Sequence, residues 1–323
     1  MRNTKRLVWM GVGVALFAVR ASTAEPPRWA YPVNPPSTAA HNTDDGRPLN
    51  VPDSTVTYVR SDLKLVAGNP VADWHPNNHP TMPEIVSHGR RDPDVSACGF
   101  CHLPNGSGRP ENTSLAGLTP DYFKAQMKAF RNDERLGPLA DRVPQTGMVT
   151  LAKRVSQSDV DAAAAYFASL SPETFVKVIE AETVPRTIVA GWMLARDPEG
   201  GTEPIGNRII EIAEDFERFE KRDSRTPYVV YAPIGSLSRG ATLVASGGGK
   251  TITCAICHGA DLNGMADIPR LAGRSPSYLF RQLFDMREGT RTGGASVLMK
   301  QVVENLTDAD MVDISAYLAS CAP

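Results

Sequence analysis

Cysteine and histidine recur in this chain in one arrangement, Cys-x-x-Cys-His, which occurs at residues 98–102 and again at residues 254–258. Two thiols two residues apart can each form a thioether bond to one edge of a porphyrin, and the adjacent histidine then reaches the iron as its proximal ligand. The sequence therefore predicts two covalently bound haem c groups. The predicted attachment residues are Cys98, Cys101, Cys254 and Cys257, and the predicted proximal iron ligands are His102 and His258.

Two other kinds of site use closely spaced cysteines. A structural zinc ion needs four protein ligands, and a redox-active dithiol needs no histidine directly after its second cysteine. Either explanation could hold for one run by coincidence. Two complete runs favour haem attachment.

The N-terminus has the features of a secretory signal peptide. Three basic residues precede an apolar run at 7–19, and small residues at 22–24 form a cleavage site. The run is too short to be a comfortable membrane span, although Arg20 after it leaves an uncleaved anchor as an alternative. We expect cleavage after Ala24 and a periplasmic protein, because bacteria attach haem covalently outside the cytoplasm.

Charge and length limit the class of partner. The leader contains four of the 34 basic residues and no acidic residue, so 34 − 4 = 30 basic residues remain against 36 acidic ones. This mildly acidic balance does not favour nucleic acid or anionic lipid as a partner, and no later apolar stretch is long enough to cross a bilayer. About 300 remaining residues predict two domains of ordinary size.

The sequence after the first run repeats after the second run, which is the signature of a duplicated domain. An offset of 156 residues aligns Tyr122 with Tyr278, Gln126 with Gln282, Arg131 with Arg287 and Arg135 with Arg291. After a five-residue difference in one loop, an offset of 151 aligns Met148 with Met299, Asp159 with Asp310 and Tyr166 with Tyr317.

Helical periodicity predicts the same order of helices in both copies. The expected helices cover residues 83–88, 121–131 and 158–170 in the first copy, and 238–246, 277–288 and 308–320 in the second, with Ser156 and Thr307 as caps. We therefore expect an all-α fold of two tandem domains. The expected organisation is a signal peptide (1–24), an arm (25–80), the first copy (81–170), an insert (171–237) and the second copy (238–323).

The arm and the insert lie outside the repeat. The arm is rich in proline, which predicts an extended segment over the first copy. The insert contains β-branched and aromatic runs at 175–184, 187–194 and 228–231, which predict a small β-rich element. Residues 209–219 fit an amphipathic helix as an alternative. Both segments are hypothesised to serve docking or domain orientation.

The distal iron ligand decides between an electron carrier and a catalyst. Only Met148 and Met299 are methionine in both copies, 46 and 41 residues after their histidines, in expected loops before the last helix. We predict that they are the distal ligands. The other methionines considered are expected to be core or insert residues, or to lie too close to a histidine: Met127, Met286 and Met311 align with other apolar residues, Met193 lies in the insert, and Met265 follows His258 by seven residues.

Histidine is the main competitor as distal ligand. Four histidines precede the first run without a counterpart in the second copy, and we do not expect them to bind iron: His41, His75, His79 and His88. His75 and His79 lie in the proline-rich arm, where an exposed histidine is ordinary. Cys321 aligns with Leu170 and is expected to be a packed thiol, with a disulfide to another chain as the alternative.

These residues together resemble the class I cytochromes c, particularly the diheme periplasmic cytochromes made of two fused copies. The resemblance rests on Cys-x-x-Cys-His, the Pro269-x-Leu-Ala-Gly run, a Tyr-x-x-x-Gln helix, a methionine and the terminal helix, over residues 85–170 and 238–321. In this family a proline carbonyl accepts a hydrogen bond from the proximal histidine. Pro269 matches that position, whereas the first copy has Thr113 there and Pro110 three residues earlier, so its acceptor stays open.

The resemblance implies single-electron transfer between a periplasmic dehydrogenase and an oxidase or other acceptor, as a shuttle or as a cytochrome subunit, and no catalytic residue. The alternative is a diheme peroxidase, which needs one open iron and unlike haem environments. Thiosulfate-oxidising diheme enzymes use a distal cysteine, but Cys321 is at the wrong end of the second copy to serve.

Overall fold

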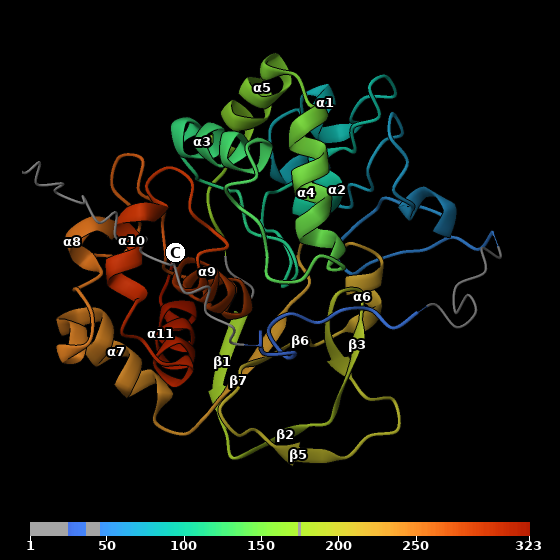
Figure 1. Ribbon diagram of the computed structural model, residues 1–323. Coiled ribbons are helices and arrows are strands. Elements are labelled where there is room, and N and C mark those ends of the chain that lie inside the picture. The colour runs from blue at the N-terminus through green and yellow to red at the C-terminus, as the bar shows by residue number, and fades with distance from the viewer. Residues whose placement is uncertain (1–24, 37–45, 174–175) are drawn as a thin grey trace, which may run out of the picture.

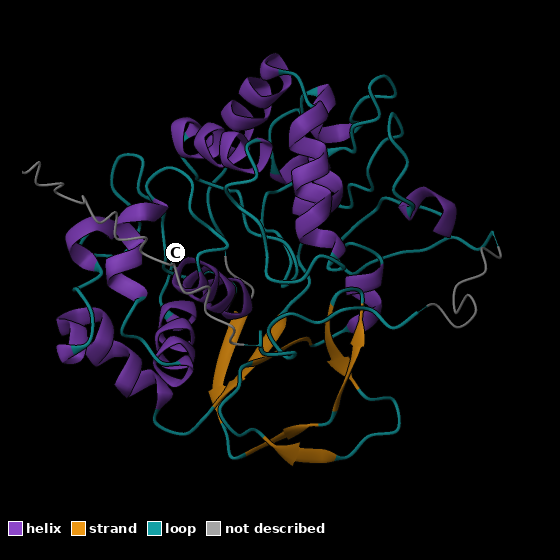
Figure 2. Ribbon diagram, viewed as in Figure 1, coloured by secondary structure: helices purple, strands orange, loops and turns teal. Residues whose placement is uncertain are grey.

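The computed structural model describes residues 25–36, 46–173 and 176–323, so the expected signal peptide and His41 lie outside the described residues. Helices dominate both copies, and the strands gather in the insert (Figure 1, Figure 2). The expected all-α fold is therefore correct for the copies, while the described residues outside them also form three small sheets. Among the described residues, no helix combines the length and apolar character needed to cross a membrane.

The first copy contains five helices. They are α1 (Glu84–Ser87), α2 (Cys98–His102), α3 (Pro120–Arg131), α4 (Val143–Arg154) and α5 (Gln157–Ala168). Ser156 caps α5 as expected, because its hydroxyl accepts a hydrogen bond from the Asp159 backbone N–H (3.1 Å). A core of apolar side chains from α1, α3, α4 and α5 holds the helices together.

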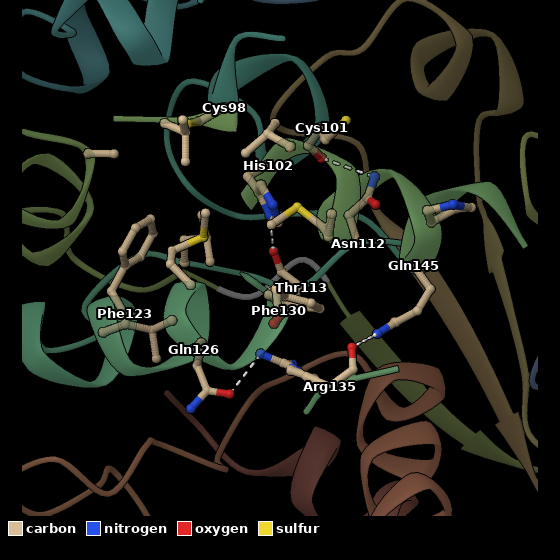
Figure 3. A pocket seen from close by; sticks show the side chains of 18 of the residues that line it. Cys98, Cys101, His102, Asn112, Thr113, Phe123, Gln126, Phe130, Arg135 and Gln145 are labelled. Atoms are coloured by element: carbon tan, nitrogen blue, oxygen red, sulfur yellow. Dashed lines mark hydrogen bonds between the residues drawn. The ribbon is translucent and has the colours of Figure 1, made fainter. Parts of the chain in front are cut away.

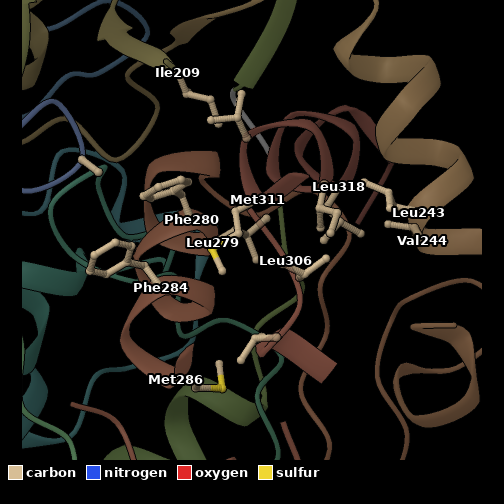
Figure 4. Close-up of a cluster of buried hydrophobic side chains, with 14 of the residues drawn as sticks. Ile209, Leu243, Val244, Leu279, Phe280, Phe284, Met286, Leu306, Met311 and Leu318 are labelled. Atoms are coloured by element: carbon tan, nitrogen blue, oxygen red, sulfur yellow. The ribbon is translucent and has the colours of Figure 1, made fainter. Parts of the chain in front are cut away.

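The second copy repeats this order. Its helices are α7 (Ser236–Ser246), α8 (Ala255–His258), α9 (Pro276–Glu288), α10 (Ser296–Val303) and α11 (Asp308–Ser320). Thr307 and Asp310 form a capping box at the start of α11. Figure 4 shows that the core of this copy is built mainly by α9 and α11, with Leu243 and Val244 of α7 closing one side.

Two of these helices contradict an expectation. Met148 and Met299 lie inside α4 and α10, not in loops. Sequence periodicity did not predict α4, because Thr146 and Gly147, both poor helix formers, interrupt its apolar pattern. Its visible start signal is Pro144, which occupies a first-turn position where the missing backbone N–H costs nothing.

The insert is β-rich, as expected. It contains β1 (Val176–Glu180), β2 (Thr183–Pro185), β3 (Thr187–Ala190), β4 (Met193–Arg196), β5 (Thr202–Pro204), β6 (Ile210–Ala213), α6 (Phe216–Glu220) and β7 (Tyr228–Ala232). The central sheet has the order β1-β7-β6, with β1 and β7 parallel and β6 antiparallel to β7. A two-residue turn at Gly191-Trp192, with positive φ at both residues, joins β3 to β4.

The alternative of one helix over residues 209–219 is wrong. Ile210 and Ile212 belong to strand β6 and are fully buried, and the short helix α6 starts only at Phe216. The residue between them, Glu211, is also buried, because its carboxylate accepts hydrogen bonds from the Ser277 backbone N–H (3.1 Å) and the Ser275 hydroxyl (2.7 Å). Pairing with β7 and packing against α9 override the helical pattern.

The arm contacts the second copy and the insert as well as the first copy. Its described residues, 25–36 and 46–80, form two short 3-10 helices, at Arg60–Leu63 and Pro76–Asn78, and an isolated pairing of Leu49 with Tyr58. Its start, however, lies in the second copy, where the Tyr31 hydroxyl donates to Asp285 (2.7 Å) within the core. Its end reaches the insert, where the Trp74 indole donates to the Lys221 carbonyl (2.7 Å).

The two copies meet through residues that the repeat aligns. Arg135 donates to the side chains of Tyr278 (3.1 Å) and Gln282 (3.0 Å) in the second copy. The mirrored bonds run from Arg291 to Tyr122 (3.2 Å) and Gln126 (3.0 Å). A backbone pairing of Arg135 with Arg291 lies beside them. The duplicated residues thus form an approximately two-fold symmetric contact between the copies.

Candidate functional site

A cavity in the first copy brings the predicted haem residues together. It encloses about 1120 Å³ not filled by atoms, including space open to solvent, and Cys98, Cys101, His102 and Met148 all line it. Apolar side chains of α3, such as Phe123 and Phe130, form a further part of its wall (Figure 3). A cavity with apolar walls and a few polar groups is typical of a cofactor site.

His102 is held in the orientation that an iron ligand needs. Its Nδ1 lies 2.8 Å from the carbonyl oxygen of Thr113, so Nδ1–H donates and the lone pair remains on Nε2. Burial lowers the pKa of His102 to about 4, which keeps the ring neutral at pH 7. Thr113, and not Pro110, therefore supplies the hydrogen-bond acceptor for the histidine of the first copy. A threonine can do so because a backbone carbonyl needs no particular side chain.

Both cysteines of this motif line the cavity. Neither Cys98 nor Cys101 is in a disulfide, and burial raises the pKa of Cys98 to about 12. The Asn112 side-chain amide donates to the Cys101 carbonyl (3.2 Å), which ties the motif to the following loop (Figure 3). Both thiols are therefore presented from one short helix, α2, toward one cavity.

Geometry alone does not select the distal methionine in this cavity. Met127 of α3 and Met148 of α4 both line it. Met127 is buried in the apolar core, as expected for a residue aligned with Leu283, whereas Met148 is only partly buried. The preference for Met148 still rests on its identity with Met299.

Buried arginines give an independent test of whether a haem fits. Arg135, Arg142, Arg274 and Arg281 line the cavity. Nε and Nη2 of Arg142 and Nε of Arg274 are buried without a hydrogen-bond partner, and burial lowers the pKa of Arg142 to about 9. A buried cation without a partner is costly, and an anionic ligand removes the cost. The two propionates of a haem supply such anions, so the residues fit the group.

The second copy has the same local geometry. His258 Nδ1 donates to the carbonyl oxygen of Pro269 at 2.8 Å, as the family resemblance implies, and burial lowers the pKa of His258. Gly264 N–H donates to the His258 carbonyl (2.9 Å), which matches the bond from Gly108 to His102 (3.0 Å). Cys254 and Met299 are partly buried and pack against the same core.

The other candidate ligands are engaged elsewhere. His75 is buried rather than exposed, because its Nε2 contacts Asp223 of the insert (2.9 Å), and His79 Nε2 contacts Asp73 (3.2 Å). His88 Nδ1 bonds to the Ser87 hydroxyl (2.8 Å). Cys321 is partly buried at the end of α11, where its thiol contacts the Tyr317 carbonyl (3.4 Å).

The remaining methionines follow the expectation. Met286 and Met311 lie in the core of the second copy, Met193 is buried in the insert, and Met265 is exposed. Sequence reasoning missed the arginines of the cavity. The signal was present for Arg135, which the repeat aligns with Arg291, but periodicity gave no reason to place it near the haem.

Comparison with known proteins agrees with this site. The sequence model of the cytochrome c family matches residues 237–322. A cytochrome c-552 of Acidithiobacillus ferridurans is 43% identical over 227 residues, covering 70% of this chain and 74% of the relative. Cytochrome c4 of Azotobacter vinelandii is 38% identical over 97 residues, which cover 28% of this chain and 46% of that protein. The chain thus spans less than half the length of the cytochrome c4 relatives it matches.

More distant relatives cover a larger part of the chain. A thiosulfate dehydrogenase electron acceptor of Stutzerimonas stutzeri is 23% identical over 240 residues, covering 73% of this chain and 84% of the relative. The structure of thiosulfate dehydrogenase from Marichromatium purpuratum covers 73% of this chain and 39% of its own, with a TM-score of 0.50 and 23% identity, which indicates a shared fold. The chain belongs to the diheme cytochrome c family.

Proposed function

We propose that this chain holds two covalently attached haems, one in each copy, and passes single electrons from a dehydrogenase-type donor to a downstream acceptor in the periplasm. The observation that carries the proposal is the repeated donor set: Cys-x-x-Cys-His with Nδ1–H bonded to a backbone carbonyl in both copies. When bound, each haem supplies an iron that takes up and releases one electron.

The protein's part is to hold each ligand set still. The bonds from His102 to Thr113 and from His258 to Pro269 fix the two rings and increase the basicity of Nε2. Met148 and Met299 are proposed as the distal ligands, and a thioether favours the ferrous state relative to a second imidazole. If these side chains fill both ligand positions of each iron, the sites would exclude peroxide and oxygen.

The contact between the copies supports electron transfer between the two proposed haems within one chain. The guanidinium of Arg135 lines the first cavity and also bonds to Tyr278 and Gln282 of the second copy. This arrangement fixes the orientation of the copies through buried hydrogen bonds. A fixed orientation keeps the distance for electron transfer constant during reduction and oxidation.

A dehydrogenase donor is supported by relatives. Two of them are named thiosulfate dehydrogenase electron acceptors. The periplasmic location is proposed from the expected signal peptide at 1–24, which lies outside the described residues. The chain is proposed to be a subunit or a committed partner, because the arm and the insert pack on both copies.

Redox titration combined with ligand binding tests the proposal. We expect reduction by two electrons per chain, no rapid binding of carbon monoxide by the reduced protein and no steady turnover with peroxide, because both irons are closed. Electron exchange with a small soluble redox protein should be fast. Steady peroxide reduction at one haem after reduction of the other would contradict the proposal.

A further inference from the structure

The two haem motifs differ sharply in how much of their outer surface is covered. Phe100 lies between the cysteines of the first motif, and Ile256 occupies the aligned position in the second. Phe100 is 9% exposed, whereas Ile256 is 65% exposed. The same contrast holds in the following loop, where Arg109 is 7% exposed and its counterpart Met265 is 52% exposed.

The aligned positions are structurally equivalent, so the contrast is not an error of register. Arg109 pairs through its backbone with Asn112, and Met265 pairs with Ile268 in the same way. The motif histidines make matching bonds as well, at 2.8 Å in both copies. Any difference in exposure must therefore come from what lies on top of each motif.

The insert covers the first motif with two side chains. Arg222, which follows α6, donates from Nη1 to the Phe100 carbonyl (2.7 Å), and its guanidinium carbon lies 3.4 Å from the centre of the Phe100 ring. Phe219 of α6 packs its ring 3.7 Å from the guanidinium carbon of Arg109. These are cation–π contacts, strengthened by burial.

Backbone contacts fix the covering loop in place. The Ser224 carbonyl accepts hydrogen bonds from Asn105 and Ser107 of the first copy, at 3.3 Å each. The carboxylate of Asp223 is fully buried between Arg218 (2.6 Å) and His75 of the arm (2.9 Å). Residues 219–224 therefore form a rigid cover over the first motif, secured from the insert and from the arm.

The second motif instead presents apolar side chains to solvent. Ile252 and Ile256 flank Cys254, and Val297 and Leu298 at the start of α10 are 64% and 72% exposed. The Thr251 hydroxyl bonds to the Val302 carbonyl (2.6 Å), which joins the motif segment to α10. The first copy has Thr146 and Gly147 where the second has Val297 and Leu298.

We propose that residues 219–224 of the insert close the cysteine-bearing haem edge of the first copy, so that electrons enter and leave through the corresponding edge of the second copy. The occupant of that exposed edge is a redox protein with its own cofactor beneath an apolar contact face. An apolar face matches the exposed Ile252, Ile256, Val297 and Leu298. The equivalent surface of the first copy is already covered within the chain by Phe219 and Arg222. This inference rests on the proposed function.

A paramagnetic probe tests the cover without measuring activity. In the ferric protein, hexacyanochromate should broaden the haem methyl resonances of one haem, assigned to the second copy by their shift in a Met299→Ala variant. The double variant Phe219→Ala, Arg222→Ala should make the first set broaden as well. Equal broadening of both sets in the unaltered protein would overturn the inference.

A charge substitution tests whether electrons pass through the exposed edge of the second copy. Ile256→Glu should lower the second-order rate of electron transfer to a soluble blue copper protein roughly tenfold, since the contact would bury an unpaired carboxylate. The matched control is Val143→Glu, an exposed aliphatic residue of the first copy (52% exposed), which should change the rate less than twofold.

The outcomes separate this inference from the proposed function. Loss of electron exchange with the copper protein in the unaltered chain would count against the proposed function, while the broadening experiment would still report on the cover. If electron exchange is fast and Val143→Glu slows it as much as Ile256→Glu does, the assignment of electron transfer to the exposed edge of the second copy is overturned. The proposed function would remain intact.

Discussion

At the scale of single residues, the duplication carries the assignment of ligands. His102 and His258 make the same bond to a backbone carbonyl although the acceptors are a threonine and a proline. The methionine is harder to choose, since Met127 and Met148 both line the first cavity. Comparison of the copies favours Met148, because Met127 aligns with a leucine and Met148 with Met299.

Substitution of these methionines checks the choice. A thioether bound to ferric iron gives a weak near-infrared charge-transfer band, so Met148→Ala and Met299→Ala should each remove about half of its intensity. Met127→Leu and Met286→Leu are the matched controls and should leave the band unchanged. Loss of the band in a control variant would show that the repeat was misread.

At the scale of elements, the sequence predicted the helices with strong periodicity and clear caps. Helix α11 has the expected bounds, and α3, α5 and α9 differ from the expectation by one or two residues at either end. Helix α4 was missed because Thr146 and Gly147 interrupt its apolar pattern, and α10 is only eight residues long. The sheet order β1-β7-β6 could not be read from the sequence either, since its parallel pair joins residues about fifty positions apart.

A partly buried ion pair at the start of α5, between Arg90 and Asp159, should make stability depend on pH. Arg90 bonds to Asp159 (2.6 Å) and lowers the pKa of that carboxyl from its usual 3.8. A depressed pKa in the folded state adds stability above pH 3.8, and this stability is lost as the pH falls through the folded-state pKa. Asp159→Asn should therefore lower the free energy of unfolding by about 1 kcal/mol at pH 7 and by little in strong acid.

Denaturant titration at several pH values measures this effect. Asp161→Asn is the control, because it removes the same charge from the same helix without breaking the bond to Arg90. If both variants lost the same stability at every pH, the loss would reflect net charge and not the Arg90–Asp159 ion pair.

At the scale of the whole molecule, the arm and the insert join the two copies into one body. The arm places Tyr31 in the core of the second copy and Trp74 against the insert, contacts that composition alone did not predict. The proline content of the arm predicts an extended segment, whereas its contacts with the second copy and the insert are made by Tyr31 and Trp74. Only the structure reveals that the insert lies over the first motif and leaves the second exposed.

The mass of the denatured protein tests most directly whether the chain holds two haems covalently. Thioether bonds survive denaturation, so the mature chain should carry two haem masses. Replacing Cys98 and Cys101 with serine should leave one, and replacing Cys254 and Cys257 should leave the other. A chain that carries one haem or none before any substitution would contradict the account.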